Sequence, residues 1–110
     1  MSKNKKYQKQ TFLYRGIEFQ YKIQASSLRK FESETGIDCE KANSRVKDGT
    51  FMLLYYCTCW KGFFVSLETF IKDCRTGKVN FRPGAREYGS LGIYKLFARK
   101  LHEYHFNGDI

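Results

Sequence analysis

The sequence predicts an α+β fold, in which an N-terminal β-hairpin packs on a small bundle of four or five helices. Apolar and polar residues alternate between Thr11 and Ile23, which is the period of a half-buried strand pair. After Ala25 the apolar residues recur every three or four positions, which is the period of an amphipathic helix. With 110 residues, 42% of them apolar, the chain has enough apolar surface for one core, and disorder throughout is excluded.

Three parts follow one another along the chain. We expect a basic flexible arm over residues 1–9, a hairpin with a helical core over residues 10–77, and a basic loop with an amphipathic C-terminal helix over residues 78–110. Arg15 and Gly16 are expected to form the two-residue turn of the hairpin, because Gly accepts a positive φ. One face of the hairpin carries the apolar side chains of Phe12, Tyr14, Ile17, Phe19, Tyr21 and Ile23.

Local signals place the first three helices. The first is expected over residues 27–35, where Gly36 stops it, and Asp38 is expected to cap a second short helix. Residues 51–61 predict a third helix with Thr50 as its N-cap and Gly62 at its end. Because this third helix is apolar on nearly every side, we expect it in the middle of the core.

The remaining elements follow from similar signals. Ser66 is expected to cap a fourth helix that ends before Gly77 and turns Leu67, Phe70, Ile71 and Cys74 inward. Residues 78–90 predict a loop or a short extended segment, because they contain the only proline of the chain. A last helix is expected over residues 91–105, with an inner face of Leu91, Tyr94, Phe97, Ala98 and Leu101, and with Tyr104 or His105 after them.

No combination of residues predicts catalysis, so we expect neither an enzyme nor a cofactor. Cys57 and Cys59 are two positions apart, roughly 200° around a helix axis, which suits shared metal ligation badly. His102 and His105 have a spacing that can hold a metal, but neither a carboxylate pair nor a cysteine cluster accompanies them. We therefore expect structural cysteines and no metal site.

The net charge of +9 is concentrated at the two ends of the chain. One interpretation is solvated charge that keeps an aromatic-rich protein in solution. The other is contact with nucleic acid or an acidic partner. The residues expected to make such contacts are Arg82, Arg86, Lys95, Arg99 and Lys100.

The first ten residues lack the apolar run of a secretory leader, and Lys61 and Glu68 interrupt the longest apolar stretch. We therefore expect a protein of the cytoplasm, with no membrane partner and with reduced cysteines.

The connection before the fourth helix holds three large rings, those of Trp60, Phe63 and Phe64. Three rings are many for one short connection to bury, and aromatic anchors dominate many protein interfaces. We hypothesise that this connection, together with Phe19 and Tyr21 of the hairpin, contacts a partner or a sister subunit. The alternative is ordinary core packing, which the sequence favours more for Trp60 than for the two phenylalanines.

The order of three segments resembles the tail assembly chaperones of long-tailed bacteriophages. The segments are Phe31–Gly36 (FESETG), Leu53–Cys57 (LLYYC) and Leu67–Ile71 (LETFI), which follow an extended pair as they do in that family. The likeness covers about residues 10–75. The segment Cys74–Lys78 is basic where the family often continues with acidic residues, and residues 79–110 have no counterpart in the resemblance.

The resemblance implies a helper protein rather than an enzyme. Proteins of this family bind the tape-measure protein, a long helical chain, and keep it soluble while tail tube subunits polymerise around it. It also implies self-association and a place in the cytoplasm of the host bacterium. The alternative from another class is a small basic regulatory protein of phage or plasmid origin that binds nucleic acid.

Overall fold

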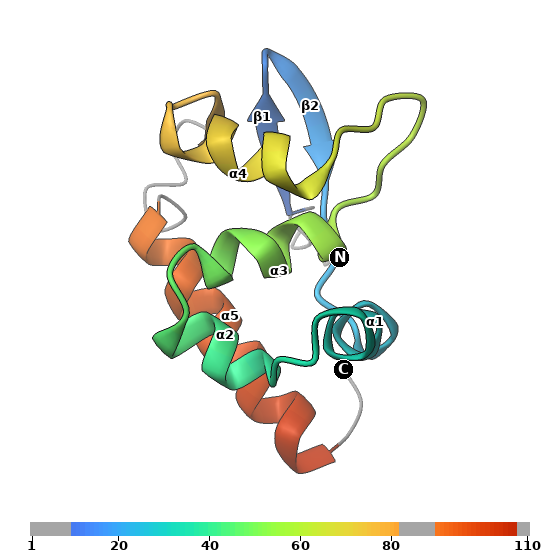
Figure 1. The fold of residues 1–110 in the computed structure, drawn as a ribbon, viewed down its shortest axis with the longest axis vertical. Coiled ribbons are helices and arrows are strands. Elements are labelled where there is room, and N and C mark those ends of the chain that lie inside the picture. The colour runs from blue at the N-terminus through green and yellow to red at the C-terminus, as the bar shows by residue number, and fades with distance from the viewer. Residues whose placement is uncertain (1–9, 82–89, 108–110) are drawn as a thin grey trace, which may run out of the picture.

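The computed structural model describes residues 10–81 and 90–107, and the fold is α+β as the sequence predicts (Figure 1). The basic arm expected over residues 1–9 lies outside the described residues. Three short strands and five helices follow one another in the order β1 (Thr11–Tyr14), β2 (Ile17–Gln20), α1 (Ala25–Thr35), α2 (Cys39–Arg45), α3 (Gly49–Cys57), α4 (Leu67–Arg75), β3 (Val79–Phe81) and α5 (Ser90–Asn107).

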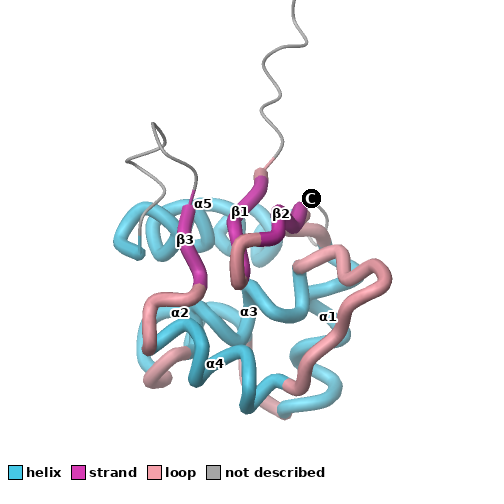
Figure 2. Tube along the Cα trace, turned by 90° about the horizontal axis from the view of Figure 1, so that it is seen from above, coloured by secondary structure: helices cyan, strands magenta, loops and turns pink. Residues whose placement is uncertain are grey.

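The predicted hairpin forms, and a third strand joins it. Arg15 and Gly16 both have positive φ, 54° and 81°, which is the backbone of a tight two-residue turn between antiparallel strands. The strand order is β2-β1-β3, with every pair antiparallel, so β1 lies in the middle (Figure 2). The segment expected to be a loop or short extended piece therefore completes the sheet at Val79–Phe81.

Helix α4 covers the apolar face of this sheet (Figures 1 and 2). The ring of Phe70 lies 5.3 Å from that of Tyr14 and 6.2 Å from that of Phe12, both measured between ring centroids. Phe81 lies opposite Phe12 in the sheet and adds its ring to the same layer, at 6.2 Å. The sheet and α4 thus form one aromatic layer of the core.

Helix α3 lies at the centre, as expected, and its two ends differ from the prediction. It begins at Gly49 rather than after Thr50. A Cβ atom on residue 49 would lie 1.7 Å from the carbonyl oxygen of Ala42, so this first position of the helix requires glycine. Only glycine lets α2 and α3 approach this closely. Thr50 caps no helix and instead donates its hydroxyl to Oδ1 of Asn43, at 2.6 Å.

Helix α3 also ends at Cys57, four residues before the predicted end and well before Gly62. The chain there leaves the helix to pair with the residues that follow β2. The backbone nitrogen of Lys22 donates to the oxygen of Cys57 at 2.9 Å, and the nitrogen of Cys59 donates to the oxygen of Gln20 at 2.8 Å. Pairing with a distant strand has therefore replaced the last helical turn that local periodicity predicted.

The predicted caps of the other helices are confirmed. Gly36 ends α1 in the left-handed conformation, with φ 73°. Asp38 accepts a hydrogen bond from the backbone nitrogen of Lys41 at 3.2 Å, and Ser66 accepts one from that of Thr69 at 3.2 Å.

Helix α5 forms as predicted, but the predicted inner face is wrong in part. Tyr94 and Ala98 are exposed, and the helix instead buries Ile93, Leu96, Phe97 and Leu101. Ile93 and Leu96 are wholly aliphatic, whereas Tyr94 carries a hydroxyl and Ala98 a single methyl group, so the observed side buries apolar surface and leaves the Tyr94 hydroxyl outside the core. Leu91 has a side chain outside the described residues.

Candidate partner-binding surface

The connection between α3 and α4 divides its three large rings between the core and the surface. Trp60 is half-buried, its indole nitrogen donates to the oxygen of Tyr55 at 3.1 Å, and its ring lies 5.7 Å from that of Phe70. Phe63 is also half-buried, 5.8 Å from the ring of Phe19. Phe64 is 70% exposed, so it alone of the three projects from the connection.

The two hairpin residues expected on the contact surface lie in the core instead. Phe19 is 6% exposed and Tyr21 is 3% exposed. On the apolar face of the hairpin, the ring of Phe12 lies beside those of Phe19 and Tyr21, and the rings of Trp60 and Phe63 pack on Phe19. The expectation that Phe19 and Tyr21 offer a free surface is therefore wrong for this chain.

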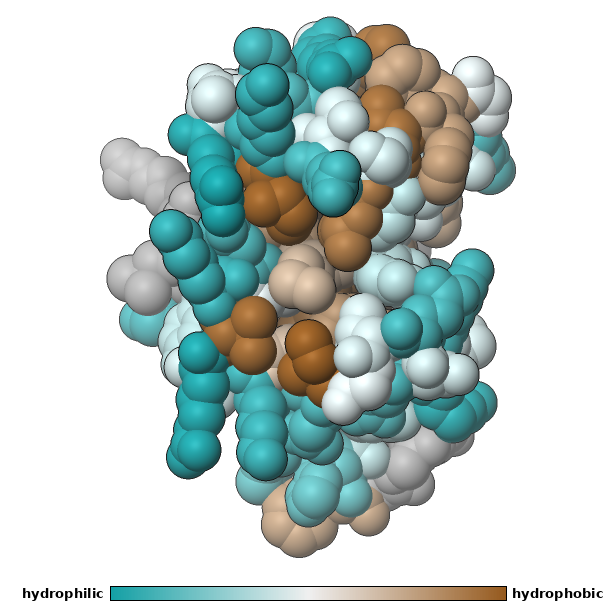
Figure 3. Space-filling model, in the orientation of Figure 1, coloured by the Kyte–Doolittle hydropathy of each residue, from teal (hydrophilic) through white to brown (hydrophobic). Residues whose placement is uncertain are grey.

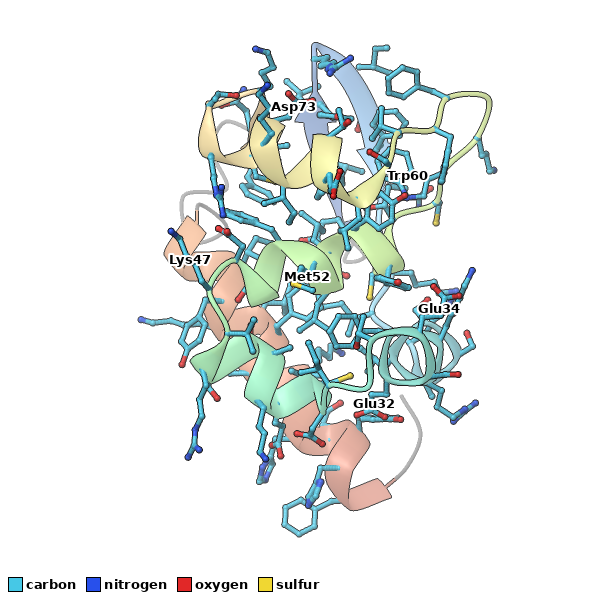
Figure 4. All side chains as sticks on the ribbon, in the orientation of Figure 1. Glu32, Glu34, Lys47, Met52, Trp60 and Asp73 are labelled. Carbon is cyan, nitrogen blue, oxygen red and sulfur yellow. The ribbon has the colours of Figure 1, made fainter. Side chains whose placement is uncertain are left out.

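A second apolar surface, which the sequence interpretation missed, crosses the front of α3. Figure 3 shows hydrophobic atoms gathered in a hollowed strip between α4 and the pair α1–α2, with hydrophilic atoms on both sides. Met52 of α3 lies in the middle of this face (Figure 4). We call this surface the α3 band. Met52 is half-buried, and Tyr56, one turn further along the same side of α3, is half-buried too.

The apolar residues of α3 predict its place in the middle of the core, but they do not predict how far its neighbours cover each side. Within α3 the side chains of Leu53, Leu54 and Cys57 are buried, whereas Met52 and Tyr56, one turn apart, are half-buried. Thr50, Phe51 and Tyr55 are half-buried as well, so the neighbouring layers cover α3 only in part.

The two ends of the α3 band carry opposite charges. Figure 4 shows Lys47 at one end and Glu34 at the other, with Met52 between them. Both charged residues are exposed. Tyr56 donates its hydroxyl to Oε1 of Glu34 at 2.9 Å. Burial of the ring and this hydrogen bond raise the pKa of Tyr56 to about 12, so the phenol stays a neutral donor at physiological pH.

A buried carboxylate fixes α4, one wall of the α3 band, to the hairpin turn. Asp73 is buried, and its Oδ2 accepts the hydroxyl of Tyr14 at 2.6 Å and Nε of Arg15 at 3.0 Å. The hydrogen bond from Tyr14, followed by the hydrogen bond and charge of Arg15, holds the pKa of Asp73 below its usual range. The backbone nitrogen of Arg15 also donates to the oxygen of Lys78 at 3.0 Å, next to the start of β3.

The cysteines show no arrangement for catalysis or metal binding within the described residues, and all four are free thiols. Cys39 and Cys57 are buried, Cys74 is half-buried, and Cys59 is exposed. Burial raises the pKa of Cys57 and that of Cys74 to about 12. These two thiols therefore stay protonated at neutral pH, the form that neither attacks a substrate nor ligates a metal ion.

A cavity of about 420 Å³ lies between α1, the start of α2 and the end of α5. Glu32, Asp38 and Glu40 supply its carboxylates, and both oxygens of Glu32 accept hydrogen bonds within the protein. One accepts the hydroxyl of Tyr104 at 3.2 Å, and the other accepts the backbone nitrogen of Cys39 at 3.0 Å. Glu32 thus joins α1 to both α5 and α2.

Of the five residues expected to contact nucleic acid or an acidic partner, the structure describes three, all on α5. Lys95 and Arg99 are exposed one turn apart on α5, and His102 and Phe106 continue the same stripe. Lys100 lies on another side of the helix and is half-buried. Arg82 and Arg86 lie outside the described residues.

Comparisons with known proteins add no assignment to these surfaces. The chain matches no family model, and it shows no significant match to a curated protein or to a solved structure. Among the helices in the described parts of the chain, none is long and apolar enough to cross a membrane.

Proposed function

We propose that this protein is a tail assembly chaperone of a long-tailed bacteriophage. In this proposal it binds an amphipathic helix of the tape-measure protein and keeps that helix soluble in the host cytoplasm while the tail tube assembles. The observation that carries the proposal is the α3 band, an apolar strip with hydrophilic rims on a face that no other element of the described chain covers. A strip of this kind fits the apolar side of a helix.

The proposed activity depends on burying apolar surface of the partner against this protein instead of against other copies of the partner. The free tape-measure helix exposes an apolar face that aggregates with its neighbours, and the α3 band removes part of that face from water. Met52 is unbranched and adapts its shape to different side chains, which suits a surface that holds several segments of one long partner. The exposed ring of Phe64, on the connection to α4, supplies a second anchor.

The proposal is tested by co-expression with the tape-measure protein encoded in the same genome. Wild-type protein is expected to keep the tape-measure protein in the soluble fraction and to co-purify with it. Met52→Asp and Phe64→Ser are each expected to lose both effects while their melting temperatures stay close to that of the wild type. Phe106→Ser is the matched control, because Phe106 is 71% exposed, as Phe64 is 70% exposed, but lies on α5.

Two outcomes would refute the proposal. In the first, the tape-measure protein is equally insoluble with and without the wild-type protein. In the second, Phe64→Ser and Phe106→Ser reduce the solubility of the tape-measure protein equally, which indicates nonspecific hydrophobic association rather than a binding site. Self-association belongs to the same proposal, and sedimentation of the wild type and of Phe64→Ser measures whether the exposed ring contributes to it.

A second candidate function is nucleic-acid binding by a small regulatory protein. The observation that favours it is the exposed stripe of Lys95, Arg99, His102 and Phe106 on α5, where the rings of His102 and Phe106 lie 4.7 Å apart. Cations that contact phosphates, beside rings on which bases stack, are typical of such surfaces. Binding to generic DNA that weakens steeply with salt, and that Lys95→Gln with Arg99→Gln abolishes, would favour this function over the chaperone.

A further inference from the structure

The α3 band has a direction, because its two ends differ in charge. Lys47 stands at the end where α3 begins, two residues before Gly49. Glu34 stands at the end where α3 finishes, and it accepts the hydroxyl of Tyr56 there. Asp48, the residue between Lys47 and Gly49, is paired with Arg75. Within the described residues Lys47 has no ion pair, so its charge is available to a ligand.

We propose that the α3 band binds one amphipathic helix of a partner protein in a single direction, antiparallel to α3. The N-terminal end of the bound helix lies at Glu34 and its C-terminal end lies at Lys47. This inference rests on the proposed function and adds the orientation of the partner.

The charges at both ends select this direction. A helix carries partial positive charge at its N-terminus and partial negative charge at its C-terminus. In the proposed orientation the N-terminus meets the carboxylate of Glu34 and the C-terminus meets the ammonium of Lys47. The reverse orientation places like charges together at both ends.

The dipole of α3 favours the same direction. Helix α3 begins near Lys47 and ends near Glu34, so an antiparallel neighbour sets its positive end beside the negative end of α3. At about 1.5 Å per residue, nine residues of α3 span about 13 Å, or two to three turns of a bound helix. The partner segment is therefore expected to place apolar side chains at i, i+3, i+4 and i+7, with an acidic residue favoured near its C-terminal end beside Lys47.

The probe for this inference is a synthetic 18-residue amphipathic helix with leucine at those spacings, neutral polar residues elsewhere, and blocked termini. Two versions carry a nitroxide label, one at the N-terminus and one at the C-terminus. In NMR spectra of the full chain, the N-terminal label is expected to broaden the amide signals of residues 33–36, and the C-terminal label those of residues 45–48. Broadening in the opposite pattern, or equal broadening at both ends with both labels, overturns the proposed direction.

Affinity gives a second readout. Lys47→Glu is expected to weaken binding of the peptide about two- to fivefold, the size of a charge effect at a helix end. Lys95→Glu makes the same charge change on α5 and is expected to leave the affinity unchanged. Equal affinities for the Lys47→Glu variant and the wild type overturn the inference.

The experiments distinguish a wrong orientation of the bound helix from a wrong binding site. If Met52→Asp abolishes peptide binding but the labels report the reverse direction, only the direction is wrong. If the peptide binds and Met52→Asp has no effect, the α3 band is not the site, and both are wrong. Met52→Gln serves the same comparison if the Asp variant does not fold.

Sedimentation and a deletion variant test two other occupants of the α3 band, a second copy of the chain and the chain's own residues 1–9. If the wild type sediments as a dimer that Met52→Asp dissociates, and the peptide does not compete, the occupant is a second copy of the chain and the inference is overturned. If deletion of residues 1–9 raises the affinity for the peptide tenfold or more, the occupant is the chain's own N-terminal segment, which also overturns it.

Discussion

Replacing Tyr14 with Phe removes one hydroxyl from the centre of the molecule and tests how α4 is held on the sheet. The Tyr14 side chain is fully buried, and its hydroxyl donates to Asp73 at 2.6 Å. The carboxylate of Asp73 retains Arg15, whose Nη2 lies 2.8 Å from Oδ2, so the charge is not left alone. The phenylalanine ring fills the same space apart from the lost oxygen, so packing of the aromatic layer is preserved.

The expected cost follows from the charge on the acceptor. A hydrogen bond to a charged group contributes roughly 1.5–3 kcal/mol to stability. For a domain of 110 residues this range lowers the melting temperature by roughly 6–13 °C. Arg15→Gln is the comparison variant. Its side chain is 42% exposed, and an exposed ion pair contributes about 1 kcal/mol or less.

Chemical denaturation of both variants across the acid range measures the effect and its origin. The pKa of Asp73 is depressed in the folded state, so its contribution is present at neutral pH and is lost as the pH falls through the folded pKa. The stability difference between wild type and Tyr14→Phe is therefore expected to shrink below about pH 4. A cost under about 0.5 kcal/mol at pH 7, or a cost that is constant down to pH 2, would contradict this reasoning.

Three further predictions concern other parts of the molecule. Gly49→Ala is expected to lower the free energy of unfolding in urea by about 3 kcal/mol or more, because the new Cβ atom clashes with the carbonyl oxygen of Ala42. A loss under about 1 kcal/mol would contradict this, since it would mean that α2 and α3 move apart at little cost. Under native conditions one equivalent of a maleimide is expected to modify Cys59, the exposed thiol, in preference to Cys57, and peptide mapping after digestion identifies the site. The free energy of unfolding is expected to fall as the pH rises above about 9. Burial raises the pKa of Cys57 and that of Cys74 to about 12 in the folded state, so folding favours the protonated thiols. A melting temperature that is constant from pH 8 to pH 11 would contradict this prediction.

Local chemistry predicted the elements whose boundaries depend on neighbouring residues. The hairpin turn at Arg15 and Gly16 and the caps at Asp38 and Ser66 form where the sequence places them. Each depends on a backbone conformation or a hydrogen bond that spans at most four residues. The fold class follows in turn from the change of apolar period near Ala25.

The candidate surface was predicted in part. The aromatic connection was singled out from its composition, and Phe64 is exposed there. Alternation places Phe19 and Tyr21 on the apolar face of a strand, but it does not predict what covers that face, and both rings are buried. Met52, Lys47 and Glu34 were missed because they come from separate elements that only the packing of α3 between its neighbours brings onto one face.

The sequence by itself determined that this chain builds a hairpin and several amphipathic helices, since these depend on periodicity and short-range hydrogen bonds. The tertiary structure decided where α3 begins and ends, because the start depends on contact between Gly49 and Ala42, and the end on pairing between Cys59 and Gln20. It also decided which side of α5 is buried and how far the neighbouring layers cover α3. These outcomes depend on the apolar area that distant segments remove from water when they pack together, a quantity that no short stretch of sequence contains.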